Sequence, residues 1–389
     1  MPRILISLIL FTFALSAQPP RVVQKITGET HKLVLFSDGT VGGWGDMREG
    51  QLGPRATIPN TRGETTAFVP ISLPGKVTDI AASTRTSYFL LDSGIVLAMG
   101  WGLSGELGCG PKCTSSAEQP VTVLGLNDVV QISASGAAAF AVHRDGTVSA
   151  WGSREAGMLG DNQHPARGNA PTFAYAPIRV PGVTGVVQVS AGGGHVLART
   201  SDGRVLAWGK LPVGVVYYDD PVELPHEVPG LNGVIAVAAS GVATALKNDG
   251  TVWVWGKNTQ AQFGNGRRTD EDRTRTPILI PKVTNITAIA AALTGRHILA
   301  LQKGGSVLAW GNSDWGQGGV GITGREQATP VGLKLTGVKA VFAAGNNSFA
   351  VREDGSLWIW GFGSEYARAW PMQKNAALPI RLDLLSQQK

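Results

Sequence analysis

Asp249-Gly250-Thr251-Val252-Trp253-Val254-Trp255-Gly256 is the stretch that decides the fold of this chain. An Asp-Gly pair between two runs of β-forming residues is a strong hairpin signal, so the octapeptide predicts a tight turn followed by a strand. Related octapeptides recur along the whole chain, and their last residues lie 47 to 57 positions apart at Gly45, Gly100, Gly152, Gly209, Gly256, Gly311 and Gly361. A period of this length is typical of propeller blades and too long for solenoid repeats.

Each of the seven units contains four segments that read as strands. The first is a short run of small residues such as Val237-Ala238-Ala239, and the second is apolar, as in Phe140-Ala141-Val142. The octapeptide strand follows, and a proline-led segment such as Thr276-Pro277-Ile278 comes last. Small residues suit the crowded axis of a ring of sheets, and a leading proline suits an outer edge strand. The sequence therefore predicts an all-β fold, a seven-bladed β-propeller of four-stranded antiparallel blades.

The third strand is apolar on both of its faces. In Val205-Leu206-Ala207-Trp208 the two alternating sets both lack polar side chains, which indicates a sheet covered on each side by another sheet. We expect the tryptophan of one blade to pack against the small residue of its neighbour, at Ala150, Ala207 or Ala309.

The overall composition agrees with a large folded core. The chain has 389 residues, of which 43% are hydrophobic and 16% charged, and the unbroken repeat favours one propeller domain over residues 18–389. The net charge of +6 is spread among the units and does not form a basic run, so no nucleic-acid partner is expected.

The first residues have the pattern of a secretory signal peptide. Arg3 precedes an apolar run from Ile4 to Leu15, and small residues precede Gln18, which predicts a signal peptide over residues 1–17 with cleavage after Ala17. The alternative is a buried first strand, but the repeat begins only at Val22 and would leave that strand without a partner. The run is too short to span a membrane and no other apolar stretch could do so, so we expect a secreted or periplasmic protein.

The repeated motifs resemble those of the regulator of chromosome condensation repeat family. The resemblance covers about residues 22–384 and rests on Asp-Gly-x-Val-x-x-Trp-Gly, on Gly50-Gln51-Leu52-Gly53 and Gly105-Glu106-Leu107-Gly108, and on the proline-led strand. It implies a seven-bladed propeller, here a secreted member of bacterial type. It also implies a binding role, because nuclear members engage a small GTPase and chromatin, and a secreted bacterial member inhibits β-lactamases. Units four and seven lack the Gly-Gln-Leu-Gly segment.

The long variable loops mark one rim as the candidate recognition face. Four antiparallel strands place the loop between strands one and two on the same rim as the loop after Trp-Gly, and variable loops on a rigid frame commonly carry binding. The candidate binding residues on this rim are Trp101, Met158, Phe263, Arg267, Arg268 and Trp315. The alternative is that these aromatics pack beneath their own loops.

Two sets of residues could suggest metal or redox chemistry. His31, His195 and His297 occupy one equivalent position in three units, where ring symmetry keeps them apart, so we expect hydrogen bonds from imidazole to nearby backbone rather than a metal site. Cys109 and Cys113 lie in one rim loop, and we expect a local disulfide that stiffens it, with a reactive thiol pair as the alternative.

Catalytic motifs are absent from the sequence, and the aspartates of the Asp-Gly pairs read as turn residues rather than an acidic cluster. We therefore expect a non-enzymatic, secreted and monomeric binding propeller without cofactors, whose partner is another protein. The alternatives are an extracellular carbohydrate-active hydrolase or lyase, a protein similar to the β-lactamase inhibitor, and a structural module of an extracellular assembly.

Overall fold

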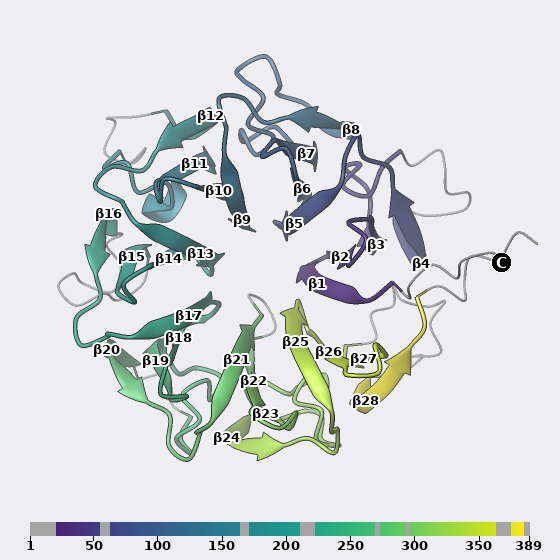
Figure 1. Cartoon of the computed structure of the whole chain (residues 1–389), viewed down its shortest axis with the longest axis vertical. Helices are drawn as coiled ribbons and strands as arrows, with labels where there is room; N and C mark the ends of the chain where they lie inside the picture. Colours follow the sequence, from purple (N-terminus) through teal and green to yellow (C-terminus); the bar gives the residue numbers. More distant parts are fainter. Residues whose placement is uncertain are drawn as a thin grey trace, which may run out of the picture.

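The computed structural model describes residues 21–54, 63–163, 171–210, 222–268, 273–292, 296–362 and 375–384. The predicted signal peptide, residues 1–17, lies outside the described residues. Seven four-stranded antiparallel sheets surround a central opening, which confirms the predicted seven-bladed propeller (Figure 1). Every sheet is built from four consecutive strands, so the sequence units coincide with blades 1 to 7.

The four strands of a blade run from the axis to the outside of the ring. The innermost strands are β1 (Val23–Gly28), β5 (Val77–Ala82), β9 (Val129–Ser135), β13 (Val186–Gly192), β17 (Val234–Ala239), β21 (Ile286–Ala291) and β25 (Val338–Ala344). The second strands are β2 (His31–Phe36), β6 (Thr86–Leu91), β10 (Ala138–His143), β14 (His195–Thr200), β18 (Val242–Lys247), β22 (His297–Gln302) and β26 (Asn347–Arg352). The third strands are β3 (Val41–Asp46), β7 (Val96–Gly100), β11 (Val148–Ser153), β15 (Val205–Gly209), β19 (Val252–Lys257), β23 (Val307–Gly311) and β27 (Leu357–Gly361). The outer strands are β4 (Glu64–Ile71), β8 (Ala117–Thr122), β12 (Phe173–Arg179), β16 (Val222–Glu227), β20 (Arg273–Leu279), β24 (Gln327–Gly332) and β28 (Ala376–Leu382).

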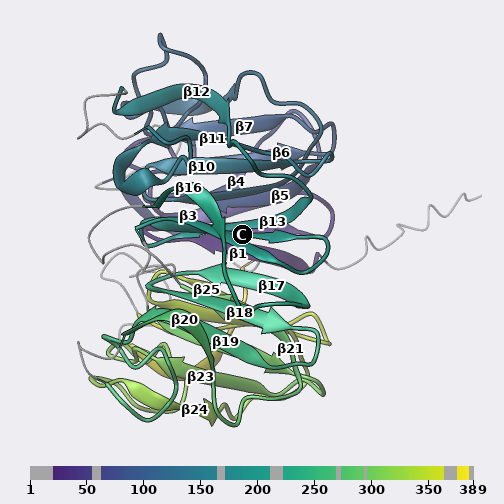
Figure 2. The same cartoon turned by 90° about the vertical axis from the view of Figure 1, so that its left-hand side faces the viewer.

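The strands run between two opposite rims (Figure 2). One rim carries the Asp-Gly turns, and we call it the turn rim. The other carries the loops between first and second strands and the loops after third strands, and we call it the loop rim. A 3-10 turn, η2 (Glu155–Gly157), lies in a loop of this rim. Among the described residues, no helix has the length and apolar character needed to cross a bilayer.

The Asp-Gly turns confirm the predicted backbone role of their aspartates. The Oδ1 atom of Asp145 accepts hydrogen bonds from the backbone N–H and the hydroxyl of Thr147, and Asp249 does the same for Thr251. These hydrogen bonds lower the pKa of Asp145 and of Asp249 because they favour the charged carboxylate. The turn also reaches the next blade, since Val186 N donates to Gly146 O over 2.9 Å.

Tryptophans of the third strands pack between blades as predicted. Trp208 of blade 4 shares a buried cluster with Ala150 of blade 3, and Trp360 of blade 7 shares one with Ala309 of blade 6. Both indoles are fully buried. Burial of a large ring against a small residue on the neighbouring sheet is therefore the repeated unit of the core.

Four of the fully buried indoles also make a hydrogen bond across the blade boundary. Trp151, Trp208, Trp310 and Trp360 donate to the backbone carbonyls of Glu106, Met158, Gln262 and Gln317, over 2.8 to 2.9 Å. These acceptors occupy the second position of the segment that reads Gly-Glu-Leu-Gly in blade 2, Gly-Met-Leu-Gly in blade 3 and Ala-Gln-Phe-Gly in blade 5. The loop-rim segment of one blade thus holds the tryptophan of the next.

The outer strands differ from the prediction in where they begin. Proline does not lead them: Pro177 is the fifth residue of β12 and Pro277 the fifth residue of β20. Each outer strand starts earlier and pairs with the third strand on both sides of a register shift, as between Ala150 and Gly152 of β11. Proline is tolerated there because an outer strand has a free edge and its missing N–H costs no ladder bond.

Side-chain packing closes the ring between blades 7 and 1. One buried cluster combines Val34 and Trp44 of blade 1 with Val351 and Ile359 of blade 7. The rings of Trp44 and Phe349 meet edge to face, with centroids 6.2 Å apart. The described strands of blades 1 and 7 form separate sheets, so no strand is exchanged at this junction.

Candidate functional site

A concave site with a volume of about 960 Å³ lies on the loop rim, and we call it the rim cavity. Loops from four consecutive blades meet there. Gly136 comes from the β9–β10 loop, Gly194 from the β13–β14 loop, Gly241 from the β17–β18 loop and Arg296 from the residue before β22. The loop after β19 supplies the remaining wall, including Gln260 and Arg268. The site therefore exists only because separate blades place their loops side by side.

Of the six residues predicted to bind a partner, three are exposed and one is half-buried. Trp315 is 42% exposed, and its ring meets that of Phe362 at 4.7 Å between centroids. Trp101 is half-buried, with the Arg85 guanidinium 5.1 Å from its ring centroid. Arg267 and Arg268 are exposed on the loop after β19, and Arg268 forms an ion pair of 3.1 Å with Glu326. Only Arg268 of these four lines the rim cavity.

Met158 and Phe263 are buried, so these two side chains do not lie on the exposed face of the loop rim where the sequence analysis placed them. Met158 is 6% exposed and Phe263 is 1% exposed, and each belongs to a buried cluster. The physical reason is the loop-rim segment described above. Within this segment, Phe263 occupies the position that Leu52 and Leu107 fill in blades 1 and 2. The Met158 carbonyl oxygen accepts a hydrogen bond from the Trp208 indole N–H. Packing beneath their own loops, the alternative raised from the sequence, holds for both.

Lys257 and Arg296 line the rim cavity, although sequence reasoning did not select them. Lys257 follows Trp255-Gly256 directly, and Arg296 directly precedes His297 at the start of β22. Both positions are the points where a blade reaches the loop rim. Comparing these two positions across the seven units would have revealed the two cations in adjacent blades.

The predicted disulfide is present in the structure between Cys109 and Cys113, whose Cα atoms are 5.7 Å apart. Both residues are partly buried against the cluster that contains Leu107 and Trp151. The bond therefore holds the loop-rim segment of blade 2 close to the tryptophan of blade 3.

The three histidines do not form a shared site, and two of them, His31 and His297, contact a serine of the next blade. His31 Nε2 lies 2.9 Å from the hydroxyl of Ser87 on the next blade, and that hydroxyl donates to Gln51 O over 2.6 Å. Because the serine has a single proton and gives it to the carbonyl, the imidazole must be the donor and carry its proton on Nε2. The prediction of a direct bond to backbone is therefore corrected: the serine hydroxyl stands between imidazole and carbonyl.

His297 repeats this arrangement, whereas His195 departs from it. His297 Nε2 lies 2.8 Å from Ser348 Oγ, which donates to Gln317 O. At the junction after His195 the serine position is Ala243, and His195 Nε2 is buried without a partner among the described residues. Burial lowers the pKa of His195 to about 3, so its imidazole is neutral near pH 7.

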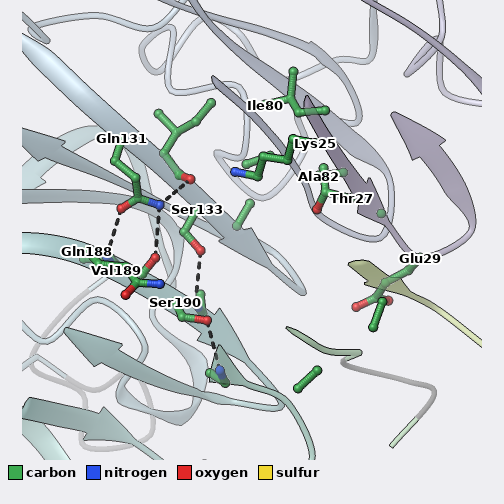
Figure 3. A pocket seen from close by; sticks show the side chains of 18 residues that line it. Lys25, Thr27, Glu29, Ile80, Ala82, Gln131, Ser133, Gln188, Val189 and Ser190 are labelled. Atoms are coloured by element: carbon green, nitrogen blue, oxygen red, sulfur yellow. Dashed lines mark hydrogen bonds between the residues drawn. The ribbon is translucent and has the colours of Figure 1, made fainter. Parts of the chain in front are cut away.

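The central channel is a second cavity of about 240 Å³, lined by the inner strands (Figure 3). Side chains on these strands bond to the backbone of the next blade. Gln131 accepts from Val189 N over 2.9 Å and donates to Val189 O over 3.1 Å, and Gln188 makes the same pair of bonds with Val237. Ser133 Oγ accepts from Ala191 N at 3.1 Å. The polar groups facing the channel are therefore largely used to join blades.

Half-buried Glu29 and buried Lys32 lie close together near the loop-rim end of the channel. Burial raises the pKa of the Glu29 carboxyl, although the Lys32 ammonium beside it acts in the opposite direction. Burial likewise lowers the pKa of Lys32 to about 8, against the attraction of Glu29. The Lys32 ammonium donates to the Glu29 carbonyl oxygen, which fixes its position.

Neither cavity presents the pair of carboxylates that hydrolysis of a glycosidic bond requires. Among the described residues, Glu29 is the single carboxylate lining the channel, and the rim cavity is lined by none. Described residues also hold no group of three or more side chains suited to a metal ion.

Comparison with known proteins identifies the repeat. Residues 186–210 and 249–301 match the family models described as regulator of chromosome condensation (RCC1) repeat. The E3 ubiquitin-protein ligase HERC2 of Mus musculus is 28% identical over 345 residues, covering 84% of this chain and 7% of that protein. The chain thus spans only about 7% of the length of that relative. This chain carries RCC1 repeats folded as a seven-bladed propeller.

Solved structures share the fold at low sequence identity. The crystal structure of human WBSCR16 superposes with a TM-score of 0.76 at 21% identity, covering 88% of this chain and 94% of that one. The crystal structure of Prp20p from Saccharomyces cerevisiae, described with its binding properties to Gsp1p and histones, gives a TM-score of 0.72 at 22% identity and covers 93% and 87% of the two chains.

Proposed function

We propose that this RCC1-repeat propeller is a non-enzymatic scaffold that binds a partner protein through its loop rim. The observation that carries the proposal is the rim cavity, where loops of four blades form one concave surface of about 960 Å³. Exposed Trp315 and half-buried Trp101 add aromatic groups on the same rim. Aromatic and arginine side chains are enriched at protein interfaces. Prp20p, which shares the fold, is described as binding the proteins Gsp1p and histones, which supports a protein partner as the class.

We further propose that the chain is a secreted protein of bacterial type that acts outside the cytoplasm. The support is the leader-like sequence of residues 1–17 and the disulfide between Cys109 and Cys113, which is typical of oxidising compartments. Expression of the full chain with an export system, followed by N-terminal sequencing of the exported product, tests this. A product that begins at Gln18 is expected. Retention of the full chain in the cytoplasm would contradict it.

Capture experiments with matched variants test the rim function. The mature chain, the variant Trp101→Ala/Trp315→Ala and the turn-rim variant Ile95→Ala are used as baits, and captured proteins are identified and then purified. Ile95 is 43% exposed, close to the value for Trp315, but it follows the Asp-Gly-type turn of blade 2 on the opposite rim. Circular dichroism confirms that each variant is folded.

The purified partner should bind the loop-rim variant at least tenfold more weakly than the mature chain, while the Ile95→Ala control keeps its affinity. Tenfold in Kd corresponds to about 1.4 kcal/mol, a moderate loss for two aromatic side chains at an interface. Equal affinity of all three proteins for every captured partner would contradict the proposal.

A further inference from the structure

The rim cavity carries a charge pattern that the proposed rim function does not by itself explain. Lys257, Arg268 and Arg296 are the charged side chains in its described lining, and no carboxylate accompanies them. Lys257 comes from the end of β19 in blade 5, and Arg296 comes from the residue before β22 in blade 6. Three positive charges from two blades therefore converge on one concave surface.

Two of these cations are available to a ligand. Lys257 and Arg296 are exposed, and neither forms an ion pair with another described residue. Arg268 is partly neutralised by Glu326 at 3.1 Å, and the Glu326 side chain is mostly buried. A negatively charged ligand could thus contact Lys257 and Arg296, and also Arg268, whose side chain is held in place by Glu326.

Backbone rather than side chains forms the wall opposite the cations. Gly193 has φ of +57°, and a Cβ atom there would lie 2.3 Å from Ser240 O of the next blade. Packing between blades 4 and 5 therefore requires glycine at this position. Gly136 and Gly194, also in the lining, leave the surface equally free of side chains. An extended chain can approach such a surface closely, and its carboxylates can still reach the cations.

We propose that the rim cavity binds an acidic segment of a partner protein, with Lys257 and Arg296 as its principal anion-binding residues. The inference rests on the proposed rim function and specifies the chemistry of the partner. Peptide is favoured over single-stranded nucleic acid because the described lining of the cavity contains no aromatic side chain, whereas such strands bind through stacking on aromatic rings. The Thr259 hydroxyl lies in the same lining and suits a peptide backbone.

A direct binding measurement tests the inference. The full mature chain is titrated into fluorescein-labelled hexaglutamate, labelled hexalysine and a labelled oligothymidylate, and fluorescence anisotropy is recorded at low and at high salt. The variant Lys257→Gln/Arg296→Gln removes the two unpaired cations. Arg144→Gln/Lys303→Gln removes two exposed cations from turns of the opposite rim and matches the change in net charge.

The mature chain should bind hexaglutamate and not hexalysine, with affinity falling as salt rises because the contacts are between exposed charges. The cavity variant should bind at least tenfold more weakly, and the turn-rim control should be unchanged. Equal weakening by both variants would reduce the effect to net charge and overturn the inference. Tighter binding of oligothymidylate than of hexaglutamate would overturn the choice of a peptide.

This inference and the rim function can fail separately. If a partner depends on Trp101 and Trp315 but binds Lys257→Gln/Arg296→Gln with unchanged affinity, the rim function stands and the acidic-segment inference is wrong. If no partner depends on the loop rim, the proposed function is wrong, and loss of hexaglutamate binding in the cavity variant still measures the anion site by itself.

Discussion

The indole N–H of a third-strand tryptophan is the smallest unit that joins two blades. Trp310 donates to Gln262 O over 2.8 Å across the boundary between blades 5 and 6. Trp255 is buried to the same degree, but its Nε1 has no acceptor among the described residues. The two residues therefore differ in one hydrogen bond and not in burial.

Phenylalanine substitutions should separate these two effects. Trp310→Phe removes a donor and leaves Gln262 O unsatisfied in the core, so it should lower the free energy of unfolding by about 1 to 3 kcal/mol more than Trp255→Phe. Urea denaturation of both variants, with equal m-values as a check on the folded state, measures the difference. Equal losses would mean that the hydrogen bond contributes nothing beyond packing.

Buried imidazoles make stability depend on pH. The folded pKa of His195 is about 3, whereas an unfolded histidine titrates near pH 6.5. Between these two values the unfolded chain binds a proton at this position and the folded chain does not. Stability is therefore complete above about pH 6.5 and falls, as the pH drops towards 3, by about 1.4 kcal/mol per pH unit for this histidine.

His195→Val should make the pH dependence of stability shallower by about that slope between about pH 4 and pH 6. Valine is a suitable replacement because Val242 fills the equivalent position in blade 5. Unfolding free energies from urea titrations at several pH values give the slope. Thr86→Val, at the same position of blade 2, should leave the slope unchanged whatever it does to overall stability, and a slope equally steep in His195→Val would contradict the assignment.

At the scale of the strand, the third residue of each inner strand decides how blades join around the channel. Lys25, Asp79, Gln131 and Gln188 occupy this position in blades 1 to 4. Asp79 binds the Lys25 ammonium on one side and accepts from Ile132 N at 2.9 Å on the other. Alanine takes the same position in blades 5 to 7, at Ala236, Ala288 and Ala340. Polar side-chain contacts therefore join the inner strands of blades 1 to 4 to their neighbours, whereas small residues pack at the same position in blades 5 to 7.

Gln131→Ala should lower the free energy of unfolding by about 1 to 3 kcal/mol, because Val189 N and O would lose their partner while partly buried. Gln24→Ala is the matched control, since Gln24 is exposed on the inner strand of blade 1. Thermal and urea denaturation compare the two variants. If Gln131→Ala lowers the free energy of unfolding no more than Gln24→Ala does, water replaces the two hydrogen bonds of Gln131 without cost.

At the scale of the whole molecule, the junction of blades 7 and 1 has the same aromatic packing as the junction of blades 3 and 4. The Phe349 and Trp44 rings meet edge to face at 6.2 Å, and the Phe140 and Trp208 rings between blades 3 and 4 do so at 6.3 Å. The closure between the first and last blades thus uses the geometry of an internal junction. We infer that the ring unfolds as one unit.

Phe349→Ala and Phe140→Ala should each cost about 3 to 5 kcal/mol, because both rings are fully buried. Each variant should still unfold in one transition when followed by tryptophan fluorescence and by circular dichroism. Two transitions in Phe349→Ala, with one in Phe140→Ala, would show that the closing junction is a separate and weaker unit.

The periodic signals in the sequence were sufficient for the fold. The Asp-Gly octapeptide, the small inner strands and the doubly apolar third strand each describe a local backbone requirement, and their phase gives the number of blades. The position of Phe263 could also have been read correctly, because it aligns with Leu52 and Leu107 within the repeated segment. The first residue of each outer strand could not be predicted from the sequence, because a proline indicates an edge strand but does not indicate where its pairing begins.

The sequence by itself determined the seven-bladed ring, because turn geometry and the alternation of side chains are properties of neighbouring residues. Only the tertiary structure decided which side chains share a surface. Lys257 and Arg296 belong to different blades and meet in one cavity, and His31 reaches Gln51 through Ser87 of the next blade. These contacts depend on how the ring brings loops of separate blades together, and a local sequence pattern does not determine the distance between residues of different blades.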